Sequence, residues 1–95
     1  MSDKTAIGTI FEQPGFRGEV IGFISGLMIV EAQLNGTVAA HASERDEFAV
    51  VLEGEVIVTI DGMQTTLTAG QSITIPAGKL HGVDTASSAK LVMIG

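Results

Sequence analysis

Residues 55–68 read Glu-Val-Ile-Val-Thr-Ile-Asp-Gly-Met-Gln-Thr-Thr-Leu-Thr, and this segment decides the fold class. Val56, Val58 and Ile60 alternate with their neighbours, so they share one face of an extended chain. The dipeptide Asp61-Gly62 then predicts a two-residue turn of type I′, which needs a positive φ at both central residues. The segment therefore predicts a β-hairpin with one apolar face.

The same two-residue period recurs along most of the chain, and no stretch shows a helical period. We expect strands over residues 5–11, 19–24, 28–34, 48–60, 65–68, 72–75 and 90–94. Turn-forming residues separate these segments, and the chain has 12 glycines that can supply the positive φ of such turns. Short strands at this spacing predict a sandwich or barrel, in one all-β domain spanning residues 1–95.

The composition limits the class of partner. Eleven acidic against five basic residues give a net charge of −6, which repels phosphate backbones and anionic lipid headgroups. The absence of cysteine excludes disulfides and thiolate metal sites. A hydrophobic fraction of 45% is high for a small monomer, so we expect a homodimer.

Two features of the sequence bear on the cellular location of the protein. Residues 1–5 are polar and show no signal-peptide pattern. The most apolar window, residues 20–30, is too short to span a bilayer. We expect a cytoplasmic protein that binds neither nucleic acid nor membrane.

The chain has only two histidines, and each stands beside a turn, where barrels carry polar side chains into a pocket. The first segment reads Gly36-Thr37-Val38-Ala39-Ala40-His41-Ala42-Ser43-Glu44-Arg45-Asp46-Glu47 and is followed by Gly54. The second runs from Gly70 to Pro76-Ala77-Gly78-Lys79-Leu80-His81. The two histidines are therefore best considered together with the carboxylates near them.

These two segments resemble the paired motifs of the cupin superfamily. The first family motif consists of Gly, His-x-His, Glu and Gly, and the second of Gly, Pro-x-Gly and His. The matching residues are His41, Glu47, Gly54, Gly70, Pro76, Gly78 and His81. The resemblance implies a cupin-type antiparallel β-barrel, the jelly roll also described as a double-stranded β-helix.

Family members with a complete motif hold Fe, Mn, Ni, Zn or Cu with three histidines and one glutamate. Here Ser43 stands at the second histidine position, and Thr85 stands where the second motif ends in asparagine. Residues two apart on a strand share a face, so we expect Ser43 to point with His41 as a fourth-ligand or pocket position, although its hydroxyl is a weak ligand. The two imidazoles and the Glu47 carboxylate suit a divalent ion such as Fe, Mn, Co, Ni or Zn and leave coordination positions open.

We therefore expect His41, Glu47 and His81 to bind a divalent metal ion together with a small organic ligand. The resemblance implies dioxygenation, isomerisation or decarboxylation of a small, oxygen-rich molecule, with the metal as Lewis acid or O₂ site. Two alternatives remain: a non-catalytic ligand-binding or sensor module, with or without a metal, and a purely structural or interaction role in which the two histidines are ordinary rim residues. Arg45 is a candidate clamp for a ligand carboxylate. The fold does not choose between an enzyme and a binding module.

Overall fold

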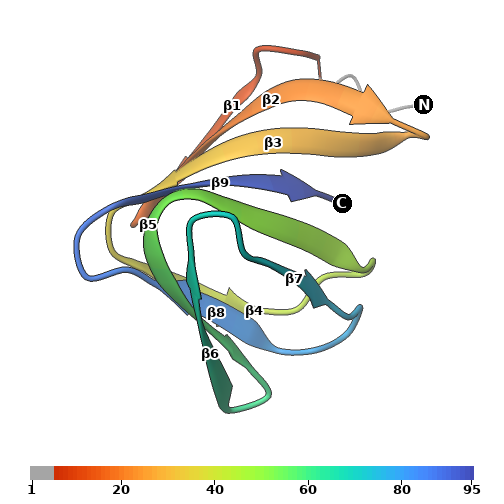
Figure 1. Cartoon of the computed structure of the whole chain (residues 1–95). Helices are drawn as coiled ribbons and strands as arrows, with labels where there is room; N and C mark the ends of the chain where they lie inside the picture. Colours follow the sequence, from red (N-terminus) through yellow and green to blue (C-terminus); the bar gives the residue numbers. More distant parts are fainter. Residues whose placement is uncertain (1–5) are drawn as a thin grey trace.

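The computed structural model describes residues 6–95, and these form nine β-strands (Figure 1). The strands are β1 (Ile10–Gln13), β2 (Phe16–Ile24), β3 (Leu27–Leu34), β4 (Thr37–His41), β5 (Glu47–Ile60), β6 (Met63–Thr68), β7 (Ser72–Ile75), β8 (His81–Asp84) and β9 (Ala89–Ile94). Within residues 6–95 we find no helix with the length and apolar character that a membrane crossing requires.

The strands form one curled antiparallel sheet whose two halves face each other (Figure 1). The first half has the order β1-β2-β3-β9-β5-β7, and the second has the order β4-β8-β5-β6. The long strand β5 belongs to both halves: residues 47–54 pair with β7 and β9, and residues 55–60 pair with β6 and β8. The predicted all-β antiparallel barrel is confirmed.

Gly54 lies where β5 passes from one half of the sheet to the other. Its φ is +84°, a conformation that L side chains rarely adopt. A Cβ at this position would also lie against the carbonyl oxygen of Ser88 and 3.0 Å from the Cα of Ala89. Glycine is therefore required here both by the backbone conformation and by the close approach of the chain before β9.

The β5–β6 hairpin has the predicted form. Asp61 and Gly62 have φ values of 48° and 83°, as a type I′ turn requires. Val56 and Val58 are 0% and 3% exposed, and Ile60 is partly buried against them. The alternation of apolar residues thus identified the buried face of this hairpin.

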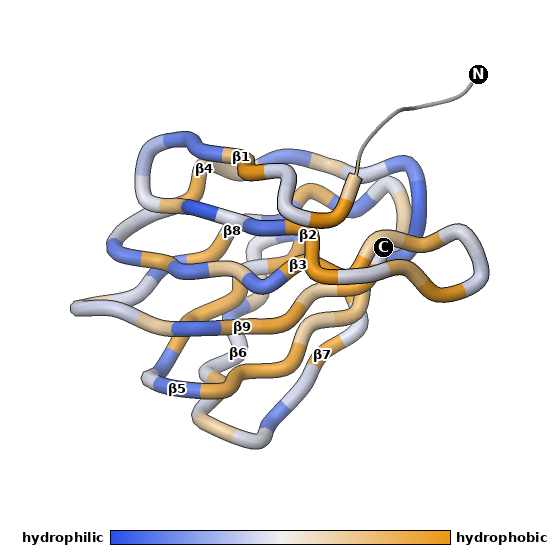
Figure 2. Tube along the Cα trace, turned by 90° about the horizontal axis from the view of Figure 1, so that it is seen from above, coloured by the Kyte–Doolittle hydropathy of each residue, from blue (hydrophilic) through white to orange (hydrophobic). Residues whose placement is uncertain are grey.

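The hydrophobic core lies between the two halves of the sheet. Figure 2 shows β9 and the first half of β5 coloured mostly hydrophobic, with hydrophilic residues where β5 bends. The buried cluster consists of Ala32, Leu34, Val38, Val51, Val56, Val58, Leu67, Ile75, Ala89 and Leu91. This small core leaves room on the concave side of the sheet, next to the ends of β4, β5 and β8.

The predicted strands differ from the observed ones chiefly at β1, β4 and β8. The predicted strand over residues 5–11 begins at Ile10, because Gly8 has a φ of +95° and residues 6–9 form a turn; Thr5 lies outside the described residues. The sequence pattern predicted neither β4 nor β8. Both are short and rich in small residues, and they form through their pairing with each other and with β5.

Candidate metal centre

His81 is fixed at the start of β8 between two neighbouring strands. Its backbone is in register with Ile60 of β5 on one side and with His41 of β4 on the other. The residue is only 3% exposed, and its Nδ1 lies 3.0 Å from the carbonyl oxygen of Lys79. A carbonyl oxygen can only accept a hydrogen bond, so Nδ1 carries the proton. The lone pair of the ring is therefore on Nε2.

His41 reaches the same site through an irregularity in β4. Val38 pairs with Val83, and the next registered pair is His41 with His81, so β4 contains one more residue than β8 over this interval. A regular strand would place Ala40 opposite His81 and would turn His41 to the other face of the sheet. The extra residue therefore acts as a β-bulge that brings the two imidazoles together.

The two imidazoles lie close together and are held in the same way. Their ring centroids are 4.4 Å apart, with an angle of 56° between the ring planes. The Nδ1 of His41 lies 3.2 Å from the carbonyl oxygen of Ala39 and therefore also carries a proton. Such a bond from the second ring nitrogen fixes the orientation of histidines that ligate metals. Both rings thus keep Nε2 free as an electron-pair donor.

Glu47 completes the group from the first position of β5. Its side chain is 23% exposed, and its Oε1 is buried without a hydrogen-bond partner among residues 6–95. This Oε1 lies 3.5 Å from Nε2 of His81. Both atoms carry lone pairs when Nδ1 holds the ring proton, so they repel each other unless a cation lies between them.

The distance between Oε1 of Glu47 and Nε2 of His81 can be compared with the distances expected for a shared proton and for a shared metal ion. A charge-assisted N–H···O hydrogen bond is about 2.7–2.9 Å long, so 3.5 Å is long for a shared proton. Two ligands of a tetrahedral zinc ion, each bonded at about 2.0–2.2 Å, lie about 3.4 Å apart. One ligand atom from each of His41, Glu47 and His81 lies within 4.8 Å of the other two. The donor set and its spacing therefore fit a divalent metal ion.

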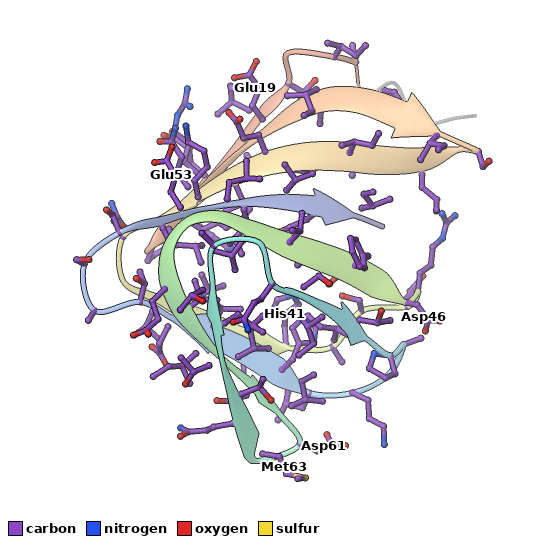
Figure 3. The ribbon with its side chains drawn as sticks, in the orientation of Figure 1. Glu19, His41, Asp46, Glu53, Asp61 and Met63 are labelled. Atoms are coloured by element: carbon purple, nitrogen blue, oxygen red, sulfur yellow. The ribbon has the colours of Figure 1, made fainter. Side chains whose placement is uncertain are left out.

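The three donor residues line a cavity of about 210 Å³. The other polar lining residue is Gln13, and the rest of the wall is apolar, including Phe16, Leu67, Ile73 and Met93 from four different strands. Figure 3 shows His41 on the concave side of the curled sheet and Asp46 at its rim. His41, Glu47 and His81 thus share one cavity inside the barrel.

Two hydrogen bonds connect the loop before β5 with the turn before β8. The backbone N–H of Ala77 donates to Oδ1 of Asp46 at 2.8 Å, and the N–H of Gly78 donates to the carbonyl oxygen of Ser43 at 2.8 Å. These bonds hold the segment leading to Glu47 against the segment leading to His81. Asp46 was not singled out from the sequence, because a carboxylate in a charged loop is most often only solvated.

Two other predicted positions, Ser43 and Arg45, are not among the residues that line the cavity. The expectation that Ser43 shares a strand face with His41 assumed a continuous strand, whereas β4 ends at His41. The structure therefore brings together His41, Glu47 and His81 but does not add Ser43 or Arg45 to them.

A larger open groove of about 740 Å³ lies beside the β1–β2 turn and the bend of β5. Its charged side chains form exposed ion pairs, Arg17 with Glu12 at 3.5 Å and Lys90 with Glu53 at 3.9 Å. Among residues 6–95, the only cluster of three metal-binding side chains is the one in the smaller cavity. Chemistry rather than size therefore identifies the candidate site.

Comparison with known proteins agrees with the observed fold. The family model described as the cupin domain matches residues 27–95. The chain is similar to the crystal structure of an RmlC-like cupin from Shewanella frigidimarina NCIMB 400, with a TM-score of 0.81 and 28% identity over 98% of this chain and 89% of that one. No curated protein shows significant similarity to the chain.

Two further solved structures show the same fold. A cupin-2 domain containing protein from Shewanella frigidimarina NCIMB 400 has a TM-score of 0.78 and 24% identity, over 82% of this chain and 78% of that one. KdgF from a Halomonas species has a TM-score of 0.77 and 23% identity, over 90% of this chain and 82% of that one. At this level of identity the similarity establishes the fold alone.

Proposed function

The chain belongs to the cupin family, and from that premise we propose that it binds a divalent first-row transition-metal ion through His41, Glu47 and His81. The ion, of the Fe, Mn, Co, Ni or Zn type, is then presented to a small organic ligand in the adjoining cavity. Three protein donors leave coordination positions for the ligand and for water. When bound, such an ion supplies a Lewis acid that polarises a coordinated oxygen.

One observation supports this proposal above the others. Nε2 of His81 and Oε1 of Glu47 face each other at 3.5 Å, and the ring proton is held on the far side by the carbonyl oxygen of Lys79. A buried carboxylate oxygen without a partner is costly, and an ion at this point would remove that cost. His41 offers a further lone pair on the same side.

The first test is direct. Protein purified without a histidine tag should contain metal by elemental analysis, and addition of Zn²⁺ or Co²⁺ to metal-free protein should raise its melting temperature. A ligand that binds only the folded state adds about 2.7 kcal/mol to the free energy of unfolding when its free concentration is 100 times its Kd. For a domain of this size, that corresponds to a rise of roughly 10–20 °C.

Matched variants locate the effect. Glu47→Gln preserves the size of the side chain but removes its charge, so it should abolish most of the rise, as should His41→Ala and His81→Ala. Glu44→Gln makes the same chemical change at an exposed position of the same loop, so it should leave the rise unchanged. Acidification should also reduce the rise, because metal binding requires imidazole and carboxylate groups that carry no proton on the ligating atom.

The negative outcome is equally informative. If no divalent ion changes the melting temperature and the purified protein contains no metal, the three residues form a metal-free polar cluster. The protein would then be a non-catalytic module that binds a small ligand through hydrogen bonds.

A further inference from the structure

We propose that the cavity accepts a small, mainly apolar molecule with one metal-binding end, of the class of a monocarboxylate with a hydrocarbon body. The inference rests on the proposed function, because the polar end of the ligand would meet the ion held by His41, Glu47 and His81. Recognition of the hydrocarbon body depends on the cavity wall alone and can be tested separately from the metal.

The polar groups of the cavity are confined to a small part of its surface. His41 and His81 each use one ring nitrogen for a backbone carbonyl oxygen and direct the other toward the metal position. Beyond these two and Glu47, the only polar lining residue within residues 6–95 is Gln13, which lies at the exposed end of β1. No lysine, arginine, serine, threonine or asparagine among residues 6–95 lines this cavity.

The wall next to the donors is made of hydrocarbon side chains. Val38 and Val83 flank the two histidines on β4 and β8. Val58 and Leu67 line the wall from β5 and β6 and are at most 6% exposed. A ligand hydroxyl placed against this wall would lose its water without gaining a partner. A polyhydroxylated molecule is therefore disfavoured, whereas a hydrocarbon body gains from burial.

The volume sets the size of this body. An apolar protein cavity of about 150 Å³ is large enough for benzene. A cavity of about 210 Å³ would then hold roughly eight to ten non-hydrogen atoms. This range includes short aliphatic acids and single-ring aromatic acids. The cavity wall thus points away from the oxygen-rich ligand that the family resemblance implies.

The test compares two six-carbon carboxylates that both fall within this size range and differ by one hydroxyl group. Hexanoate and 6-hydroxyhexanoate are titrated separately into Zn²⁺-loaded protein labelled with ¹⁵N, and binding is followed by amide chemical shifts. We expect hexanoate to bind at least about tenfold more tightly, with shifts centred on β4, β6 and β8, because the terminal hydroxyl group would lose its water against the apolar wall. Equal or tighter binding of 6-hydroxyhexanoate would overturn the proposal, and so would the absence of binding by hexanoate.

A cavity-filling variant distinguishes binding of the hydrocarbon body from binding of the metal ion. Ala49 lines the cavity and is 7% exposed, so Ala49→Leu should fill part of the space and weaken hexanoate binding at least fivefold, yet keep the Zn²⁺-induced rise in melting temperature. Val50→Leu enlarges the next residue of β5, which does not line the cavity, and should leave hexanoate affinity unchanged. Equal hexanoate affinity in both variants would contradict the assigned binding position.

A metal-free measurement distinguishes this proposal from the proposed function. 1-Hexanol lacks a carboxylate and should shift the same wall residues in metal-free protein. If hexanol binds while no metal does, the apolar cavity stands as a ligand site and the metal proposal falls. If metal binds but neither hexanol nor hexanoate does, the metal proposal stands and the apolar ligand class is refuted.

Discussion

Replacing Gly54 with alanine should destabilise the protein more than the same change at Gly70, although the two glycines have nearly the same backbone conformation. Their φ values are +84° and +88°. A Cβ at Gly70 would meet no atom within 4 Å, whereas a Cβ at Gly54 would collide with backbone atoms of Ser88 and Ala89. Comparison of Gly54→Ala with Gly70→Ala therefore separates the energetic cost of backbone strain from the cost of the steric collision.

The expected magnitudes follow from these two terms. A non-glycine residue held at positive φ costs roughly 1–2 kcal/mol, and this cost applies to both variants. The gain from restricting the unfolded chain, about 0.4–1 kcal/mol, also applies to both and cancels in the comparison. The collision adds roughly 1–3 kcal/mol at Gly54 alone. This steric term is hard to relieve because the nearest atoms belong to the backbone, where β9 begins at Ala89.

The assay is thermal unfolding of both variants, followed by circular dichroism under the same conditions. A change of 1 kcal/mol moves the melting temperature of a domain of this size by roughly 4–8 °C. Gly54→Ala should therefore melt at least about 4 °C below Gly70→Ala. Equal melting temperatures would show that β5 and β9 can separate at this point, and would refute the close approach of Ser88 and Ala89 as a reason that glycine is required there.

Two further predictions concern the loop and the outer sheet. Asp46→Asn weakens the acceptor for the N–H of Ala77 and should lower Zn²⁺ affinity about three- to tenfold, as measured by isothermal titration. The control variant Glu44→Gln should leave Zn²⁺ affinity unchanged. Equal Zn²⁺ affinities of the two variants would show that the loop contact does not support the site. The homodimer also remains a proposal, supported by exposed Ile10, Phe11 and Phe23 on the edge strand β1 and its neighbour β2. Sedimentation velocity at micromolar concentration should give twice the chain mass, and a monomer would contradict it.

The sequence predicted best where one strand carries its own periodic signal. The hairpin of β5 and β6 was read correctly because Val56, Val58 and the Asp61-Gly62 turn lie within one short segment. β4 and β8 were missed because Thr-Val-Ala-Ala-His and His-Gly-Val-Asp contain too few large apolar residues to show an alternation. Their extended form depends on pairing between segments far apart in the chain, and no local pattern records such pairing.

The candidate site also depends on strand pairing that no local sequence pattern records. Motif spacing selected His41, Glu47 and His81, and these are the three side chains whose donor atoms converge. The spacing could not indicate which face of the sheet His41 occupies, because the side chains of a strand alternate and a shift of one residue exchanges the faces. The extra residue between Val38 and His41 decides this, and only the register with β8 reveals it. The bulge brings His41 close to Oε1 of Glu47, which has no hydrogen-bond partner among residues 6–95. Bulges are known to re-aim side chains at functional sites. The irregularity of β4 therefore supports the proposal that His41, Glu47 and His81 bind a ligand together.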